Sequence, residues 1–317
     1  MRTYRTIAVF LWVFFLAGTP AAVWAQAGYG WVCPAAAKVG SAPSVYTGYF
    51  FQNKGADFSF TTDDTGVNTA LEVRQQFDLQ GIWLELMVPV KGNGPLGLVL
   101  GWSYLFPIDR TSNETMRLSA EPTRYRTWRA DTQWWNLQAA LTYDLHPSAT
   151  FIAGFRYDTF QTNFYNPSVQ VGPAGGANDT ANIALNAYIP FFGCAVSNIA
   201  PSTGLDIEIG AIGFPTVLGS VDYIEVVSAG IPIGGFDSPG FPASNEFGKG
   251  YFFEAFGEVG VPLFYGWQAG AFVKYSTINA KTDIHVGERN ANIPTTLYEF
   301  NLDRRSWVFG GRVSLCF

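Results

Sequence analysis

Apolar and polar residues alternate with a period of two along most of the chain from about residue 80 onward. Such alternation places successive side chains on opposite faces of a β-strand, and turn-forming residues fall between the alternating segments. The pattern predicts nine antiparallel strands, in the ranges 82–90, 96–106, 133–145, 150–160, 182–191, 204–213, 250–261, 264–279 and 306–317. The fold class is therefore all-β.

Alternation also fits a soluble β-sandwich, so other features must decide between the two architectures. The polar faces mix charges with Gly, Ala and Asn, whereas a face in water would be rich in Lys and Glu. Short connections are expected at 91–94, 146–148 and 262–266, and long ones at 107–129, 164–179, 214–248 and 281–298. Short turns at one rim and long loops at the other are typical of outer-membrane barrels.

The end of the chain supports the same interpretation. Val313, Leu315 and Phe317 alternate on one face of the last strand, and Phe317 is the final residue. This ending resembles the signal by which bacterial outer-membrane proteins are recognised for insertion. The resemblance implies an antiparallel transmembrane β-barrel in the outer membrane, with membrane lipid and the barrel-assembly machinery as partners.

Composition excludes several other classes of protein. The chain is 48% hydrophobic, 16% aromatic and 14% charged, against about 25% charged residues in an average soluble domain. A disordered chain is therefore excluded. The net charge of −6 argues against a nucleic-acid partner. No apolar run beyond the N-terminus reaches the roughly 18 residues of a membrane-spanning helix.

The first 25 residues have the pattern of a secretory signal peptide. Arg2 and Arg5 precede the apolar stretch 7–18, and small residues stand near Ala25, after which cleavage is expected. The predicted organisation is thus a signal peptide at 1–25, a periplasmic tail at 26–43 and an outer-membrane barrel at 44–317.

An even number of strands is required, because the last strand and the N-terminus both lie on the periplasmic side. Residues 44–62 supply a tenth strand, and eight or twelve strands are the alternatives. Ten strands leave a narrow lumen. Alternation places nine charged residues in it: Glu85, Arg156, Asp158, Asp206, Glu208, Glu254, Glu258, Lys274 and Arg312. A structural polar network is favoured over a cation path, because unpaired buried charges are costly.

Length, the ten-strand count and an acidic extracellular rim resemble the omptin family of outer-membrane proteases. The resemblance implies an Asp-His couple and a second Asp pair on opposed extracellular strand ends. Asp283 and His285 have the Asp-x-His spacing, but they follow the ninth predicted strand. The family carries its couple after the seventh strand, where this chain has Asp222 and Tyr223. The resemblance is therefore one of architecture.

A second enzymatic class is lipid A-modifying hydrolases or acyltransferases, for which His285, Ser276 and Glu288 are candidates. The chain has two His residues and shows no metal-binding or phosphate-binding motif, so neither a metal nor a cofactor is expected. These features favour a non-enzymatic barrel with a structural, binding or narrow-channel role. The extracellular ligand is not identified by the sequence.

Three cysteines are expected at the periplasmic end of the barrel. Cys33 lies in the tail, Cys194 in the connection 192–203, and Cys316 next to the end of the last strand. A disulfide is expected between Cys33 and Cys194, because both would lie on flexible segments. Three unpaired thiols are the alternative.

Overall fold

The structure is a computed structural model and consists of β-strands in its described part. The described residues are 43–53, 57–62, 69–74, 79–90, 95–118, 121–171, 180–197, 199, 204–226, 243–247, 249–265, 267–286 and 296–316. The strands are β1 (Ser44–Gln52), β2 (Asp57–Thr62), β3 (Thr69–Arg74), β4 (Leu79–Pro89), β5 (Leu96–Leu118), β6 (Glu121–His146), β7 (Ala149–Val171), β8 (Thr180–Ser197), β9 (Asp206–Phe214), β10 (Leu218–Val226), β11 (Ala243–Phe247), β12 (Lys249–Pro262), β13 (Trp267–Val286) and β14 (Thr296–Cys316). No helix in this part of the chain is long and apolar enough to cross a membrane.

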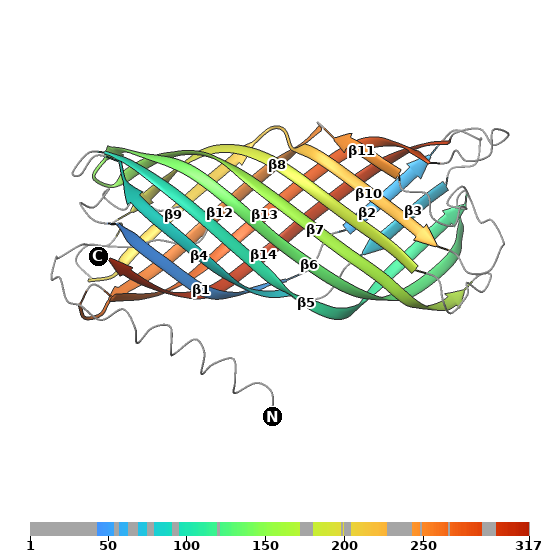
Figure 1. Cartoon of the computed structure of the whole chain (residues 1–317), viewed down its shortest axis with the longest axis horizontal. Coiled ribbons are helices and arrows are strands. Elements are labelled where there is room, and N and C mark those ends of the chain that lie inside the picture. The colour runs from blue at the N-terminus through green and yellow to red at the C-terminus, as the bar shows by residue number, and fades with distance from the viewer. Residues whose placement is uncertain are drawn as a thin grey trace, which may run out of the picture.

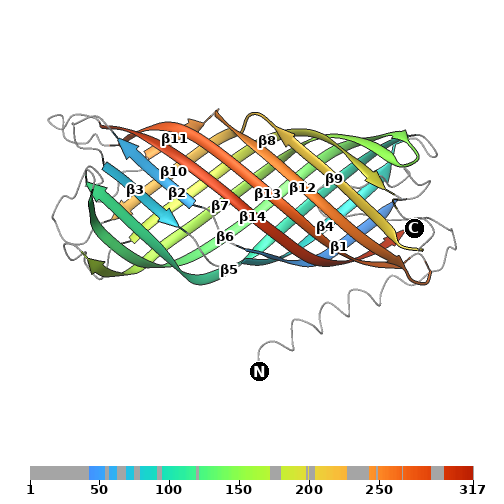
Figure 2. The ribbon, with the colours of Figure 1, turned by 180° about the vertical axis from the view of Figure 1, so that it is seen from behind.

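The strands close into a barrel, which Figures 1 and 2 show from opposite sides. The closed ring consists of β1, β4, β5, β6, β7, β8, β9, β12, β13 and β14, each antiparallel to its neighbours. Closure occurs between the first and last strands, where Ser44 pairs with Cys316 and Gln52 with Val308. The predicted ten-stranded antiparallel barrel is therefore confirmed.

The other four strands lengthen members of this ring at the end opposite the C-terminus (Figure 1). β2 continues β1 along β14, and β3 continues β4 along β5. In the same way β10 continues β9 along β8. Pro215 lies in the break between β9 and β10, and proline has no backbone N–H to donate to the ladder.

An apolar belt surrounds the outer face of the barrel near the end with the short turns. Large exposed side chains such as Leu100, Leu137 and Phe309 lie in it. Aromatic residues border the belt on its far side: Tyr49, Tyr104, Trp135, Tyr157, Tyr188, Tyr251, Tyr275 and Trp307. Neighbouring members pair across strands, as Tyr104 does with Trp135 and Tyr275 with Trp307. Such a girdle marks the boundary between lipid and water in transmembrane barrels.

Beyond the girdle the strands continue, and here the sequence-based expectation of long loops was wrong. Most of the predicted loop at 107–129 belongs to β5 and β6, and much of 164–179, 214–248 and 281–298 is also strand. β6 alone has 26 residues. An apolar band about 25 Å high needs roughly 33 Å of strand tilted by about 40°, and 26 residues extend over about 86 Å. The barrel wall therefore reaches far beyond the membrane belt.

We call the part beyond the girdle the tower. It comprises residues 57–62, 69–74, 107–118, 121–134, 159–171, 180–187, 277–286 and 296–306. Its outer face is polar, with exposed Arg129, Gln133, Gln161, Asn163, Lys281, Glu299 and Arg305. Among the described side chains its interior is mainly apolar, with buried Phe58, Trp128, Trp134, Phe160, Phe164, Ile183, Leu185, Ile278, Phe300 and Leu302. Buried polar groups such as Arg126, Thr132 and Thr162 lie among them. The tower thus resembles a soluble barrel, with a polar outer face and a mainly apolar interior, whereas the outer face of the membrane part is apolar and polar and charged side chains are buried in its lumen.

This inversion explains the one predicted segment whose faces are exchanged. Ile183, Leu185 and Ile189 were expected on the outer face of segment 182–191, opposite Asn182 and Asn186. They are buried inside, and both asparagines lie on the outer face. Because much of this segment is in the tower, water rather than lipid surrounds it. The apolar side chains therefore belong to the interior.

We expect Gly48→Ala to destabilise the barrel. A Cβ at Gly48 would lie 2.3 Å from the carbonyl oxygen of Gly311 and 2.4 Å from Nε1 of Trp83, so strand β1 or the indole must shift. Overpacking of this kind costs about 1–3 kcal/mol, measurable as a lower midpoint in denaturant titration followed by tryptophan fluorescence. Gly257→Ala is the control, since its nearest neighbours lie at 3.8 Å. Equal midpoints for the two variants would contradict the expectation.

Candidate functional site in the barrel interior

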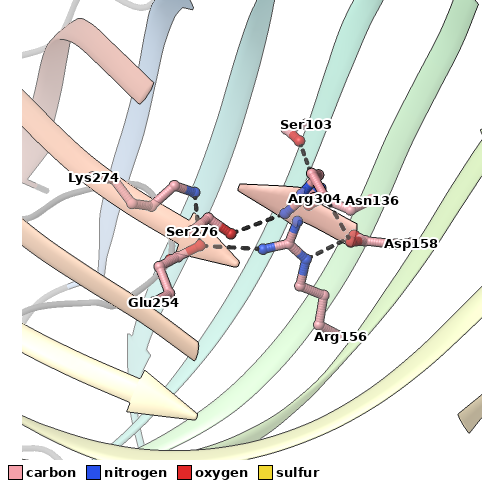
Figure 3. A network of polar contacts seen from close by, with 8 residues as sticks. All are labelled: Ser103, Asn136, Arg156, Asp158, Glu254, Lys274, Ser276 and Arg304. Carbon is pink, nitrogen blue, oxygen red and sulfur yellow. Dashed lines mark hydrogen bonds and ion pairs between the residues drawn. The ribbon is translucent and has the colours of Figure 1, made fainter. Parts of the chain in front are cut away.

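A network of charged side chains lies in the barrel interior where the tower meets the membrane part. Figure 3 shows its members from close by. Glu254 of β12 joins two cations, with its Oε2 3.1 Å from Nζ of Lys274 and 3.5 Å from a guanidinium nitrogen of Arg156. Arg156 also donates from Nε to Oδ1 of Asp158 at 2.7 Å. All of these side chains are buried. Inward positions of β7, β12 and β13 therefore meet in the centre of the barrel.

Arg304 of β14, the strand next to β13, completes this central network. It donates to Oγ of Ser276 at 2.9 Å and lies 4.0 Å from Oδ2 of Asp158. Its guanidinium also stacks over Trp134, 4.1 Å from the ring centroid. A cavity of about 20 Å³ between Asp158, Arg304 and the apolar side chains above them is large enough for one water. Four of the charged side chains of this network, Arg156, Asp158, Glu254 and Lys274, are thus linked to one another by ion pairs, and Arg304 joins them from β14.

Two aromatic rings separate this layer from the polar groups below it. Trp83 of β4 and Phe272 of β13 meet edge to face with their centroids 6.1 Å apart, and both are buried. Phe272 lies against Gly310, where a Cβ would be 2.4 Å from its ring. We call this pair the aromatic septum. Gly310 is the register partner of Phe272 on the neighbouring strand β14, and the absence of a side chain there leaves room for the ring.

Below the septum lies a second group of charges, which we call the acidic layer. It consists of Glu85, Asp206, Glu208, Glu258 and Arg312. Glu258 forms an ion pair with Arg312 and stands directly opposite Glu208 in the register of β12 and β9. Glu85 approaches from β4 and interacts electrostatically with Glu258 and Arg312. With all groups ionised, the sum is four negative charges against one positive charge.

The nine charged residues predicted in the lumen thus lie in two separate layers. Eight of them are buried inside the barrel, and Asp206 is half-buried. Glu254 and Lys274 are in contact, although the register differs from the expected one, with Glu254 opposite Ser276 rather than position 272. The sequence interpretation missed Arg304, because residues 296–305 had not been assigned to a strand. Arg304 could have been found from the alternation: it stands two residues before Ser306, so extending the last strand backward places its side chain on the same inward face.

The residues predicted as catalytic candidates do not form an active site in the described part of the structure. Asp283 and His285 lie near the end of β13, opposite Glu299 and Leu297, and their side chains are outside the described part of the structure. Ser276 is buried in the central network instead of facing the outer leaflet. Glu288 lies outside the described residues. Among the described residues, no group of three or more His, Cys, Asp or Glu could hold a metal ion.

The cysteines are arranged differently from the expectation. Cys194 belongs to strand β8 rather than to a connection, and it is an exposed free thiol. It lies on the outer face, with buried Ala195 on the other side of the strand. Cys316 pairs with Ser44 in the backbone register, and Cys33 is outside the described residues. The predicted disulfide from Cys33 to Cys194 involves a residue outside the described part and stays a prediction.

A closed antiparallel barrel with an apolar outer belt and an aromatic girdle defines the class of outer-membrane β-barrels. Among solved structures, the outer membrane protease OmpT from Escherichia coli aligns with a TM-score of 0.61 and 8% identity, over 86% of this chain and 97% of that chain. The translocator domain of autotransporter NalP from Neisseria meningitidis aligns with a TM-score of 0.38 and 16% identity, over 88% and 89% of the two chains. No family model and no curated protein matches the sequence. The likeness to OmpT shows the fold alone.

Proposed function

We propose that the protein is an outer-membrane barrel with a closed lumen, whose tower serves as a rigid non-enzymatic scaffold for binding at the cell surface. The observation that carries the proposal is the filling of the described interior. An apolar core, the central network and the aromatic septum follow one another along the barrel axis. Ten strands leave little room for a channel, and these layers fill it.

The proposal includes the cellular location and partners. After removal of residues 1–25, the chain would enter the outer membrane with the help of the barrel-assembly machinery, which would recognise Val313, Leu315 and Phe317. Lipid would surround the apolar belt. The polar outer face of the tower would then meet the medium, and rigid scaffolds of this kind often support recognition by their connecting segments.

Conductance measurements in a planar lipid bilayer test whether the lumen is closed. Purified, folded protein is inserted into a planar lipid bilayer, and a wide porin prepared in the same detergent serves as the control for insertion. We expect no stable conductance steps from this barrel, because ions would have to pass the central network and the septum. Reproducible ohmic steps from the wild-type protein would contradict the closed lumen.

An enzyme at the extracellular rim is the second proposal, favoured by the fold likeness to an outer membrane protease. Asp283 and His285 would supply an acid-base couple there. Peptide and lipid A substrates can be tested with the wild type and with His285→Ala. Turnover that His285→Ala abolishes would support the enzyme and contradict the non-enzymatic scaffold.

A further inference from the structure

The outer wall of the tower differs in charge from one side to the other. On β12, β13 and β14, exposed or half-buried charged side chains face outward: Lys249, Lys281, Glu299, Asp303 and Arg305. By contrast, residues 159–171 of β7 and 180–187 of β8 contain no charged residue. These two strands are nearest the viewer in Figure 1, and β13 and β14 are nearest in Figure 2. Surfaces in water usually have about 25–35% charged residues, so the uncharged side has an unusual composition.

Side-chain amides take the place of charges on this side. Asn163 of β7 stands opposite Asn182 of β8 in the register of the two strands. Gln161 stands opposite Gln133 of β6 on the other side of β7. We call the outward residues here the amide face, which consists of the exposed or half-buried residues Gln133, Thr159, Gln161, Asn163, Asn182, Ala184 and Asn186.

Hydrogen bonds within the wall hold two of these amides in place. Asn182 donates from Nδ2 to Oδ1 of Asn163. The hydroxyl of Tyr157 donates to Oδ1 of Asn186 at 2.8 Å. Each of these bonds uses the oxygen of one amide and leaves the N–H donors of the same side chain for a ligand. The amide face therefore presents oriented donors to the medium.

Aromatic rings border the amide face at both ends. Toward the membrane, Tyr157 packs against Trp135 with ring centroids 5.4 Å apart, and against Tyr188 at 5.0 Å. At the other end, the half-buried Tyr165 lies two residues beyond Asn163 on the same face of β7. A molecule on the amide face thus meets hydrogen-bonding groups in the middle and flat apolar rings at the edges.

The charges around the amide face disfavour an anionic ligand. Asp131 of β6 stands opposite Asn163, and Asp222 of β10 stands at the border formed by the next strand. Arg129 lies one outward position beyond Asp131, outside the face. A phosphate or carboxylate would therefore meet acids at both borders and no cation on the face itself. A neutral polyhydroxylated molecule avoids this cost, because amides offer both donors and acceptors to hydroxyl groups.

We propose that the amide face binds an uncharged oligosaccharide presented from the medium. The proposal rests on the proposed role of the tower as a binding scaffold, and it names the class of ligand. Neighbouring amides are separated by about 4.8 Å between strands and about 6.6 Å along a strand, so one sugar ring can reach two of them. The apolar C–H faces of the sugar pack on the bordering aromatic rings. The phosphates of a lipid headgroup would find no counter-charge here, so the sugar is assigned to the medium.

A printed array of neutral, sialylated and phosphorylated oligosaccharides, probed with the folded protein in detergent, tests this proposal. We expect binding to neutral members of the array. The double substitution Gln161→Ala with Asn182→Ala should weaken that binding about tenfold, because each change removes hydrogen bonds to the sugar. Asn301→Ala is the matched control and should bind like the wild type. Asn301 accepts a hydrogen bond from Asn279 at 3.1 Å, in an amide pair on the charged side of the tower.

Three results would overturn the proposal. They are no binding to the neutral oligosaccharides, binding confined to the sialylated or phosphorylated ones, and neutral binding that the double substitution leaves unchanged. Immobilised lipopolysaccharide is a further probe, and binding to it in place of the soluble neutral sugars would assign the face to a lipid headgroup instead. Gln161 is exposed and Asn182 is half-buried on the outer face, so the unboiled variant should migrate on a gel like the unboiled wild type. A barrel that binds no sugar can still be non-conducting, so this proposal and the closed lumen fail separately.

Discussion

Replacing Glu254 by alanine is expected to lower the free energy of unfolding by about 3–5 kcal/mol, because it removes one partner from a buried ionic network. Lys274 loses its ion pair with this carboxylate, and Arg156 keeps its contact with Asp158 alone. The charge of Lys274 then lies in a closed interior without its carboxylate. Denaturant titration of the detergent-solubilised barrel, followed by tryptophan fluorescence, measures the loss.

The control is an ion pair of the same kind on the surface. Arg305 and Asp303 lie 3.0 Å apart on the outer side of β14, where Arg305 is 62% exposed. Exposed pairs contribute little, so Asp303→Ala should leave the midpoint nearly unchanged. The double substitution Glu254→Ala with Lys274→Ala should recover part of the lost stability. If Glu254→Ala were as stable as Asp303→Ala, the central network would have no structural role.

Replacing Phe300 by alanine is expected to loosen the tower while leaving the membrane part folded. Phe300 is fully buried and stacks against Phe58, with ring centroids 6.3 Å apart. Truncating a buried phenylalanine costs about 3–5 kcal/mol. The loss falls on the tower, since Phe58 in turn packs on Phe160 within it. Limited proteolysis of the folded protein measures the result, with new cuts expected between residues 107 and 129.

The neighbouring position provides the control for this experiment. Glu299 is exposed on the same strand, with its side chain 54% accessible, so Glu299→Ala should leave the proteolysis pattern unchanged. The wild type should resist cleavage between 107 and 129 because most of this range is paired strand. Rapid cleavage of the wild-type protein there would mean that the tower is not a folded barrel in solution.

The membrane part of the barrel could be predicted from the sequence because two strict environments meet there. Lipid demands apolar side chains such as Leu100 and Leu137 on the outside, and the narrow lumen holds polar ones such as Ser103 and Asn136 on the inside. Every second residue of a membrane strand, the one that faces lipid, must therefore be apolar. Alternation, turn positions and the even strand number together gave the ten-stranded ring and the positions of most lumen charges.

The tower was missed because its alternation has the opposite sense. In β6, Trp128, Ala130 and Trp134 are buried, while Arg129 and Gln133 face water. The outward positions of these strands are charged or polar. Because every outward position was expected to be apolar, as it is against lipid, these segments were interpreted as solvated loops. Arg304 was lost for the same reason, since its strand was assumed to begin at 306. The separation of the charges into two layers depends on the septum between Trp83 and Phe272, which are far apart in sequence.

The water-facing wall of the tower has a consequence for how the surface of this protein can change. Along β7 in the tower, Gln161 and Asn163 project outward, while Phe160 and Phe164 are buried in the interior. Substitution at the outward positions alters the exposed surface without disturbing the packed side. A population of variants could therefore diversify its exterior position by position on a rigid frame. Insertions into connecting segments would not be needed.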